Sequence, residues 1–513
     1  MKKLRDNWPL AIALTLLRCL ARNDGHLVYS LDDTYIHMAL AKHLVRDHVW
    51  GVTKYEFSSS QSSLLWPLLI ALFYLPAGPN EWAPLVLNIL LATAFIWYLF
   101  VLLKRAGLPG ALNLLVLVEM MVLVPLAVMV FDGMEHVLQM LTSLAFVYLS
   151  AQILSSQSAP RRTSAGLLGL ALLLPAVRYE GLFLLAPVVG LFWLRRRWLA
   201  GVAVPALAVL PMVAYGVVAS AHGAYWLPNS VLLKSHYIGV MQQKEPVSDL
   251  LRTPLIYMMA PAALLYAVRR RAGFWDPGQL MLLVFLVASL LRAFVGTIAH
   301  PRYSAYLLTL GLYALATSVY AALSAAQVAA RWRTWVAAGA MAILVVARPG
   351  QSRLAWAIHF PVGATNVYQQ QYQMGRFLRT YYHGQAVAAN DIGAISYFAD
   401  LRLLDIWGLA TQEVTRARLN RLYNGAAIGR LARDKGIRVA VVYRSWLFDV
   451  LPGLHGPPRR WVEMGRWRIP YNVICGDDTV NFYAVDPSEA PRLRQHLEDF
   501  ATRLPPQVEQ TIS

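Results

Sequence analysis

Residues 82–103 read WAPLVLNILLATAFIWYLFVLL, a run without a charged side chain, and Lys104 and Arg105 follow it directly. An α-helix of that length rises about 33 Å, which is enough to cross the roughly 30 Å hydrocarbon core of a bilayer. The whole chain shares this character, because 57% of its 513 residues are hydrophobic and only 14% are charged. Ordinary soluble domains carry about 25% charged residues. The composition therefore excludes a disordered chain, a fibrous repeat and a soluble multidomain enzyme, and it predicts a polytopic α-helical membrane protein.

Further apolar segments occur on both sides of this run, and several of them are shorter than the roughly 20 residues that a span usually needs. They are 8–22, 64–78, 109–130, 134–153, 163–177, 181–194, 198–219, 254–268, 279–298, 303–325 and 334–347.

Basic residues gather in short clusters between the apolar segments, and cytoplasmic loops of membrane proteins carry an excess of Lys and Arg. The clusters are Lys2/Lys3/Arg5, Lys104/Arg105, Arg161/Arg162, Arg195 to Arg197, Arg269 to Arg271 and Arg331/Arg333. They fall on one side of the membrane only if residues 64–78, which contain Pro67 and Pro76, do not cross it. We therefore expect an interfacial or re-entrant helix there, about 11 transmembrane helices and an N-terminus inside. The net charge of +18 then reflects membrane orientation, and no nucleic-acid partner is expected.

The density of charge divides the chain into two parts. About an eighth of residues 1–347 are charged, against about a fifth of residues 348–513. The boundary lies near Arg348-Pro349-Gly350, residues that favour a turn. We predict a transmembrane domain over 1–347 and a soluble domain over 348–513, on the side opposite the basic clusters.

The second part shows the alternation of strands and helices that is typical of an α/β domain. Predicted strands are 386–390, 401–406, 438–443 and 480–485, and predicted helices are 367–383, 392–399 and 412–434. Asp391 then lies at the C-terminal end of a strand, where ligand sites of α/β sheets occur. The chain contains no glycine-rich nucleotide-binding motif and no Cys/His spacing typical of a metal site.

Polar residues outside the basic clusters fall in the outer loops of this topology. They are Asp32/Asp33, Asp132/Glu135, Arg178/Glu180, Asn229/Lys234 and His300/Arg302. Ionisable residues at membrane depth are costly and are usually functional. These pairs come from distant segments and share one membrane face, so we predict a polar site there.

Individual residues of this site allow two interpretations each. A carboxylate at position 32 or 33 could cap the helix that follows it, or could take a proton from an acceptor hydroxyl. Lys234 and Arg302 could extend to the membrane interface, or could hold a phosphate. Glu119, in the middle of an apolar segment, favours a helix contact with Arg292 over a proton relay.

The outer-loop residues resemble the GT-C superfamily of membrane glycosyltransferases, and among its bacterial members the mycobacterial terminal arabinofuranosyltransferase family. The matching segments are LDDTYI at 31–36, SSLLW at 62–66, GME at 133–135, RYEG at 178–181, LPNS at 227–230 with Lys234, PRY at 301–303, NDIGA at 390–394 and LDIWGL at 404–409. They occur in the family's order along nearly the whole chain. Tyr179 stands where the pattern has Pro, and His136 stands where it has Thr, which affects the sugar and acceptor more than the reaction class.

The resemblance implies a glycosyltransferase of the bacterial inner membrane whose donor is a polyprenyl-phosphate-linked sugar. Arabinofuranose or another pentose is the candidate sugar. The acceptor would be an extracytoplasmic glycan, lipid or protein, and the C-terminal domain would be periplasmic. Asp33 or Asp32 would be the catalytic base. Residues implied in substrate binding are Glu135, Arg178, Glu180, Asn229, Lys234, His300, Arg302 and Asp391, with Arg302, Lys234 and Arg178 neutralising the departing phosphate.

Two further expectations concern cofactors and the competing class of function. The two adjacent carboxylates could bind Mg²⁺ or Mn²⁺, but no cofactor or metal is expected to be required. A transporter or flippase for a lipid-linked sugar is the alternative function. Such a protein would need alternating access, often with internal repeats, and the sequence shows no clear repeat.

Overall fold

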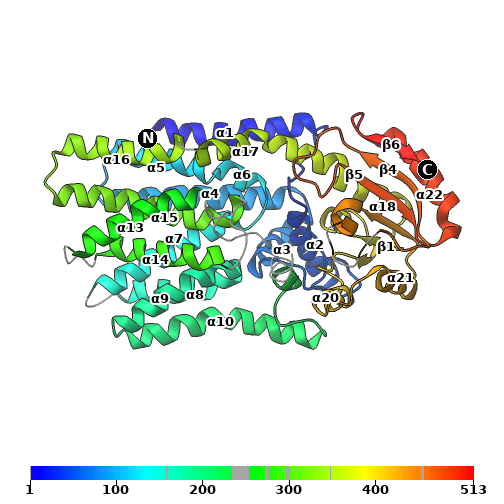
Figure 1. Cartoon of the computed structure of the whole chain (residues 1–513), viewed down its shortest axis with the longest axis horizontal. Helices are drawn as coiled ribbons and strands as arrows, with labels where there is room; N and C mark the ends of the chain where they lie inside the picture. The colour runs from blue at the N-terminus through cyan, green and yellow to red at the C-terminus, as the bar shows by residue number, and fades with distance from the viewer. Residues whose placement is uncertain are drawn as a thin grey trace.

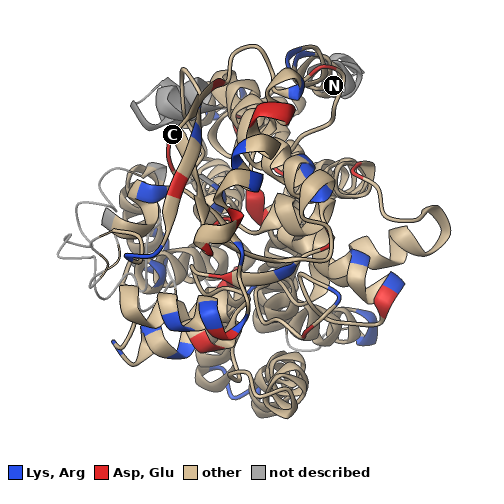
Figure 2. Ribbon diagram, turned by 90° about the vertical axis from the view of Figure 1, so that its right-hand side faces the viewer, with Lys and Arg blue, Asp and Glu red and all other residues tan. Residues whose placement is uncertain are grey.

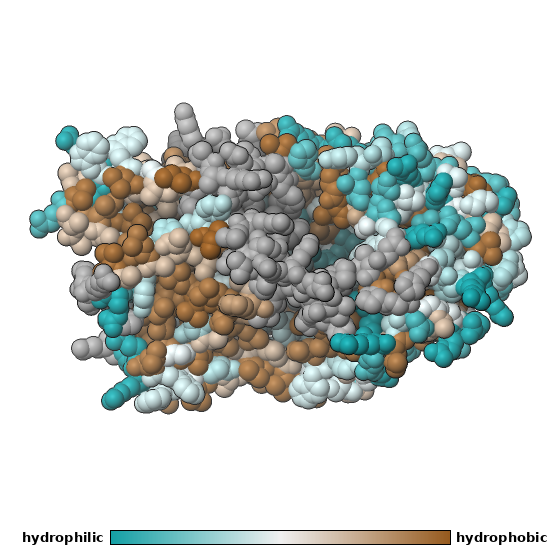
Figure 3. Space-filling view, viewed as in Figure 1, coloured by the Kyte–Doolittle hydropathy of each residue, from teal (hydrophilic) through white to brown (hydrophobic). Residues whose placement is uncertain are grey.

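Apolar helices fill one end of the molecule and a mixed β-sheet forms the other (Figure 1). This computed structural model describes residues 2–156, 160–233, 253–271, 276–294, 301–346, 348–449, 451, 454 and 456–513. Figure 3 shows hydrophobic residues gathered over the helical end and hydrophilic residues over the sheet end. Seen from the sheet end, Lys and Arg are interspersed with Asp and Glu (Figure 2). The surface thus changes from lipid-compatible to water-compatible along the long axis.

The helices of the apolar end follow the predicted apolar segments. They include α1 (Lys2–Arg22), α4 (Trp82–Arg105), α7 (His136–Ser155), α8 (Arg161–Val177), α9 (Leu182–Leu194), α10 (Trp198–Ala221), α13 (Pro254–Arg271), α14 (Pro277–Phe294), α15 (Pro301–Ala325) and α16 (Ala330–Val346). Of these, α9 is, with 13 residues, shorter than the others. Among the described residues, 5 helices are long and apolar enough to cross a membrane: α4, α7, α10, α14 and α15 from Arg302 onward. The chain is thus a helical membrane protein, and the larger number of about 11 crossings stays a prediction.

Two shorter helices lie between α1 and α4, next to the sheet domain (Figure 1). α2 spans Asp32–Asp47, and α3 spans Leu65–Ala77 with 13 residues. A helix of that length rises about 20 Å, less than the hydrocarbon core. Leu68, Leu72 and Leu75 are exposed along one face of α3, because residues three and four apart are neighbours on a helix. The length and this apolar stripe support the prediction that residues 64–78 do not cross.

The expected single helix over 109–130 is divided, which corrects the sequence prediction. α5 ends at Leu123 and α6 runs from Leu126 to Phe131. Pro125 has no N–H group to donate and disfavours a helical residue before it, so the helix ends there. Within α5, Glu119 is buried and its carboxylate has no hydrogen-bond partner among the residues that the structure describes. The contact with Arg292 that we expected is therefore not formed.

The C-terminal domain is built on a 6-stranded sheet in the order β2-β1-β3-β5-β4-β6. Its strands are β1 (Ala386–Ala389), β2 (Arg402–Asp405), β3 (Val439–Val442), β4 (Val462–Arg468), β5 (Thr479–Ala484) and β6 (Glu509–Ile512). β1 pairs in parallel with β2 and β3, and the other pairs are antiparallel. The predicted strands are β1, β2, β3 and β5. The sequence prediction missed β4 and β6. In these strands exposed residues alternate with buried or half-buried residues over part of the length.

The predicted helix over 412–434 is two helices, α20 (Gln412–Leu419) and α21 (Gly425–Asp434). Arg421 takes a positive φ of 58° between them, a conformation that ends a helix. The Asn424 side chain then accepts the backbone N–H of Ala427 and caps α21. Asn at a helix N-cap satisfies a donor that would otherwise lack a partner.

The expected turn at Arg348-Pro349-Gly350 is also wrong, because α17 begins at Arg348 and continues to Val367. Proline is tolerated in the first turn of a helix, where its missing N–H has no partner to lose. α17 packs against α1 and α5 and leads through the π-helical turn η2 (Tyr368–Tyr372) into α18 (Gln373–Tyr381). Nearly continuous helical chain thus joins the apolar helices to the sheet domain.

Candidate active site

The two adjacent aspartates of α2 have different partners. The carboxylate of Asp32 accepts the backbone N–H groups of Gly393 at 2.5 Å and Ala394 at 2.8 Å. Both residues start α19 (Gly393–Phe398), which follows β1 in the sheet domain. The N-cap of α2 itself is Leu31, and no side chain caps it. Asp32 therefore does not cap its own helix by a hydrogen bond but binds the start of a helix in the other domain.

This contact depends on the absence of a side chain at position 393. A Cβ atom there would lie 2.1 Å from the backbone oxygen of Asp32, which is closer than any real contact. Asp391 precedes this glycine at the end of β1, as predicted, and accepts a hydrogen bond from Gln371 Nε2 at 2.9 Å. Burial and the neighbouring Asp32 carboxylate raise the pKa of Asp391 well above its usual range. The protonated form of Asp391 is therefore favoured beside Asp32.

Asp33 pairs instead with an arginine of the helical region. Its Oδ2 lies 3.1 Å from Arg302 Nη2 in α15, and the Asp33 side chain is 31% exposed against 12% for Arg302. The Arg302 guanidinium also donates to Tyr303 Oη at 3.0 Å and lies over the ring of that tyrosine. Asp33 is thus a carboxylate that solvent or a ligand can reach, held beside a cation.

A further carboxyl group lies near this pair. Asp132, between α6 and α7, accepts the hydroxyl of Ser30 at 2.8 Å. Burial raises the pKa of Asp132 to about 7, against the opposing effects of Ser30 and Arg302. Asp132 therefore changes its charge near neutral pH, within the field of Arg302.

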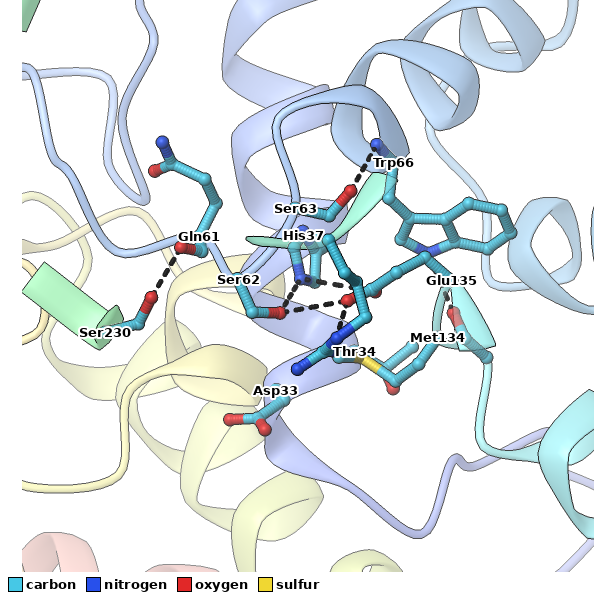
Figure 4. Close-up of polar contacts among 12 residues, drawn as sticks. Asp33, Thr34, His37, Gln61, Ser62, Ser63, Trp66, Met134, Glu135 and Ser230 are labelled. Atoms are coloured by element: carbon cyan, nitrogen blue, oxygen red, sulfur yellow. Dashed lines mark hydrogen bonds and ion pairs between the residues drawn. The ribbon is translucent and has the colours of Figure 1, made fainter. Parts of the chain in front are cut away.

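Glu135, Arg178 and Glu180 form one buried ion-paired group. Arg178 Nη1 lies 2.5 Å from Glu135 Oε1, and Arg178 Nε and Nη2 bind Glu180 in a bidentate pair at 3.0 and 2.8 Å. Ser62 Oγ donates to Glu135 Oε1 at 3.1 Å, and His37 Nε2 lies 3.1 Å from that hydroxyl (Figure 4). Because two carboxylates already neutralise Arg178, it is less suited to a departing phosphate than Arg302 is.

Asn229 joins the helical region to the sheet domain. Its backbone N–H donates to Ser59 at 2.8 Å, and its side chain donates to the Leu409 carbonyl at 3.0 Å. The adjacent Ser230 donates to the carbonyl of Gln61 (Figure 4). These bonds hold the loop that carries Ser62. Lys234 and His300, which we also predicted for this site, lie outside the described residues.

The sequence prediction missed His37, Ser62 and Tyr303 as members of the site. His37 follows Asp33 by four positions, and residues at that spacing lie on one face of a helix, so the signal was present. Ser62 and Tyr303 belong to the quoted segments but carry no charge that marks them. Among the described residues, no three His, Cys, Asp or Glu side chains form a group that could hold a metal ion. Asp32 and Asp33 also engage different partners rather than one common position.

The comparisons with known proteins can be placed beside this geometry. Residues 364–483 match a family described as a domain of unknown function, DUF8728. The crystal structure of ArnT from Cupriavidus metallidurans bound to undecaprenyl phosphate superposes with a TM-score of 0.53 and 12% identity, covering 94% of this chain and 98% of that one. The chain is similar in fold to ArnT.

Two further solved structures were matched. ArnT in the apo state gives a TM-score of 0.52 at 13% identity, covering 95% of this chain and 99% of that chain. The mycobacterial arabinofuranosyltransferase AftD gives 0.41 at 16% identity, and the match covers 94% of this chain but 41% of AftD. No curated protein matches the sequence. The likeness to ArnT thus shows a similar fold over nearly the whole chain, while the identity is too low to assign a substrate.

Proposed function

We propose that this protein transfers a sugar from a polyprenyl-phosphate donor to an acceptor hydroxyl, with Asp33 as the general base. The Asp33–Arg302 pair carries the proposal, because it sets a reachable carboxylate 3.1 Å from a guanidinium group. Guanidinium groups suit phosphate oxygens, and a carboxylate can accept the proton of an attacking hydroxyl. The ArnT structure of similar fold holds undecaprenyl phosphate, which supports this class of donor.

The reaction needs a base and a partner for the leaving group. The acceptor hydroxyl loses its proton to Asp33, and its oxygen forms a bond to the anomeric carbon of the sugar. The bond between that carbon and the phosphate oxygen breaks, and the polyprenyl phosphate leaves with the electron pair. Arg302 stabilises the negative charge that develops on this phosphate. In the structure Arg302 is paired with Asp33, so the donor phosphate has to take the place of Asp33 on the guanidinium.

The remaining residues position this pair. Asp32 holds α2 against α19, and we assign it a positioning role rather than a catalytic one. Glu135 and Glu180 are oriented by Arg178, and the half-exposed Glu180 is the one that a sugar hydroxyl can reach. Asp391, Asn229 and the loop at Ser62 fix the two domains around α2. No nucleotide site is required, because the donor is bound through a lipid phosphate.

The sequence resemblance suggests arabinofuranose or another pentose as the sugar and an extracytoplasmic glycan, lipid or protein as the acceptor. With the basic clusters inside, the protein would be in the bacterial inner membrane and its C-terminal domain in the periplasm. These assignments refine the proposal and can fail without affecting the reaction class.

The decisive experiment compares Asp33→Asn with the matched variant Asp499→Asn, which lies exposed on α22 (Ala490–Phe500). Purified protein is supplied with synthetic polyprenyl-phosphate arabinofuranose and, separately, polyprenyl-phosphate mannose, and release of polyprenyl phosphate is measured. Loss of a general base typically slows a reaction about 10²–10⁴-fold, so Asp33→Asn should lose activity while Asp499→Asn keeps it. An unchanged Asp33→Asn rate would refute the assignment. Movement of the intact donor across vesicle membranes without sugar release would support the transporter alternative.

A further inference from the structure

A cavity of about 460 Å³ opens on the opposite side of α2 from the Asp33 site. The C-terminal half of α2 forms one wall, and residues of α18 and of the segment 397–400 form the others. The segment between α3 and α4 closes one edge. The charged and histidine side chains around it are Lys42, His43, Arg46, Asp47, Lys54, Glu81, Arg379, His383 and Asp400.

Three cations of this cavity have no carboxylate partner. Lys42 Nζ donates to the backbone oxygens of Ser396 at 3.2 Å and Tyr397 at 2.7 Å. Arg46 and Arg379 are exposed, and neither forms a hydrogen bond or ion pair within the described part of the chain. Burial, with Arg46 nearby, lowers the pKa of Lys42 to about 8. An anion in the cavity would favour the charged form of this lysine.

The acidic side chains do not balance these cations. Asp47 lies 2.7 Å from His43 Nδ1, and Asp400 lies 2.5 Å from Lys54 Nζ. Glu81 is the remaining carboxylate, and it makes no ion pair with any described residue. Around the cavity, the four cations Lys42, Arg46, Lys54 and Arg379 stand against the three carboxylates Asp47, Glu81 and Asp400, which leaves an excess of one positive charge when both histidines are counted as neutral.

The edge of the cavity lies beside the first residue of a candidate membrane span. Pro79 and Glu81 line it, and Trp82 follows as the first residue of the candidate span α4. The Trp82 side chain is 47% exposed, and Leu75 near the end of α3 is 66% exposed. Tryptophan is enriched at membrane–water interfaces. The cavity therefore opens at headgroup depth, on the same side as the sheet domain.

We propose that this cavity binds the phosphate of an anionic lipid headgroup. Two unpaired guanidinium groups and a buried ammonium group match the charge and the oxygens of a phosphate. The exposed apolar side chains of Leu75 and Trp82, which come before and after the lining residues Pro79 and Glu81 in the sequence, would contact the acyl chains. The site lies on the sheet-domain face of α2, apart from Asp33, so the proposal does not depend on the glycosyltransferase assignment. A bound lipid would link α2, α18 and the start of α4.

The test measures thermal unfolding of the full-length protein in a neutral detergent with added phosphatidylglycerol, phosphatidylcholine or inorganic phosphate. Phosphatidylglycerol should raise the midpoint, and the other two additions should not. Each basic residue near an anionic headgroup contributes about five-fold in affinity. The double variant Arg46→Ala/Arg379→Ala should therefore need roughly 30-fold more phosphatidylglycerol for the same shift.

A second variant, which should lower the phosphatidylglycerol concentration needed for the shift, keeps the proposal testable even if the double variant is unstable. Glu81→Gln removes the free carboxylate, so the same shift should appear at lower phosphatidylglycerol concentration. Arg416→Ala, an exposed arginine outside the cavity, should behave as the unchanged protein does. The proposal fails if the arginine double variant keeps the wild-type response or if Glu81→Gln weakens it. An equal shift with inorganic phosphate would show that the ligand is a soluble anion and not a lipid.

Discussion

The carboxylate of Asp32 accepts the backbone N–H of Ala394 at 2.8 Å across 362 positions of sequence. This bond and its neighbour from Gly393 connect the first helix after α1 to the sheet domain. The adjacent Asp33 takes no part in it and faces Arg302. Consecutive aspartates thus have different partners: Asp32 holds the domains together, and Asp33 is the residue to which the proposed function assigns the chemistry.

We predict that Asp32→Asn acts on stability more than on catalysis. The amide keeps one acceptor oxygen but places an NH₂ group against a backbone donor. Hydrogen bonds to charged groups contribute about 1.5–3 kcal/mol, so the free energy of unfolding should fall by about 1–3 kcal/mol. Denaturant unfolding of Asp32→Asn and Asp33→Asn, followed beside their transfer rates, separates the two roles. The assignment would be reversed if Asp32→Asn kept its stability and lost its rate.

Gly393→Ala should destabilise the same contact through the backbone. Its Cβ would meet the Asp32 carbonyl oxygen, which no rotation of a side chain can move away. We expect a loss above about 2 kcal/mol, in the range of overpacking substitutions. Gly425→Ala is the matched control, because a Cβ at position 425 meets nothing within 4 Å. If both variants unfold at the same denaturant concentration, the close approach of α2 to α19 is wrong.

Much of the architecture followed from periodicity and charge. The apolar runs located the helices, and alternating short strands located β1, β2, β3 and β5. Errors occurred where one residue overrode a pattern. Pro125 divided an apolar run, and a positive φ at Arg421 divided an amphipathic one. Pro349 had the opposite effect, because its place in the first turn of α17 made it compatible with a helix.

The sequence predicted which residues belong to the site but not which of them contact one another. Sign and spacing indicated that Asp33 and Arg302 share one face, and the structure brings them together. Nothing in the sequence indicated that Arg178 would be bound by both Glu135 and Glu180, or that Asp32 would reach Gly393. The first set of contacts depends on how α7 packs against α8, and the second on how α2 packs against α19, and only the tertiary structure specifies this packing.

Asp132 should give the stability a measurable dependence on pH. Burial raises its pKa in the folded protein to about 7 from the ordinary 3.8 of an aspartate. Between these values the unfolded chain loses the proton while the folded protein keeps it, so stability falls as pH rises from about 4 to about 7. Asp132→Asn should flatten this part of the profile, because the amide oxygen can still accept from Ser30 and does not ionise. Unfolding midpoints measured from pH 4.5 to pH 7.5 test this, and an unchanged slope in the variant would contradict the assignment.

The pairing of Arg302 with Asp33 leads to opposite effects on donor binding and on rate. Arg302→Ala removes the phosphate partner, so donor affinity should fall about 10–100-fold, as for loss of a charged hydrogen bond, and the rate should fall with it. Asp33→Asn removes the carboxylate that competes with the phosphate for the guanidinium. A partly exposed ion pair contributes up to about 1 kcal/mol, so this variant should bind donor up to about five-fold more tightly while its transfer rate collapses.

Arg302→Lys should recover part of the affinity, since a charge remains without the bidentate geometry. Donor binding and single-turnover transfer, measured on these variants and on Arg416→Ala, distinguish the cases. Weaker donor binding by Asp33→Asn would mean that Asp33 contacts the sugar rather than competing with its phosphate.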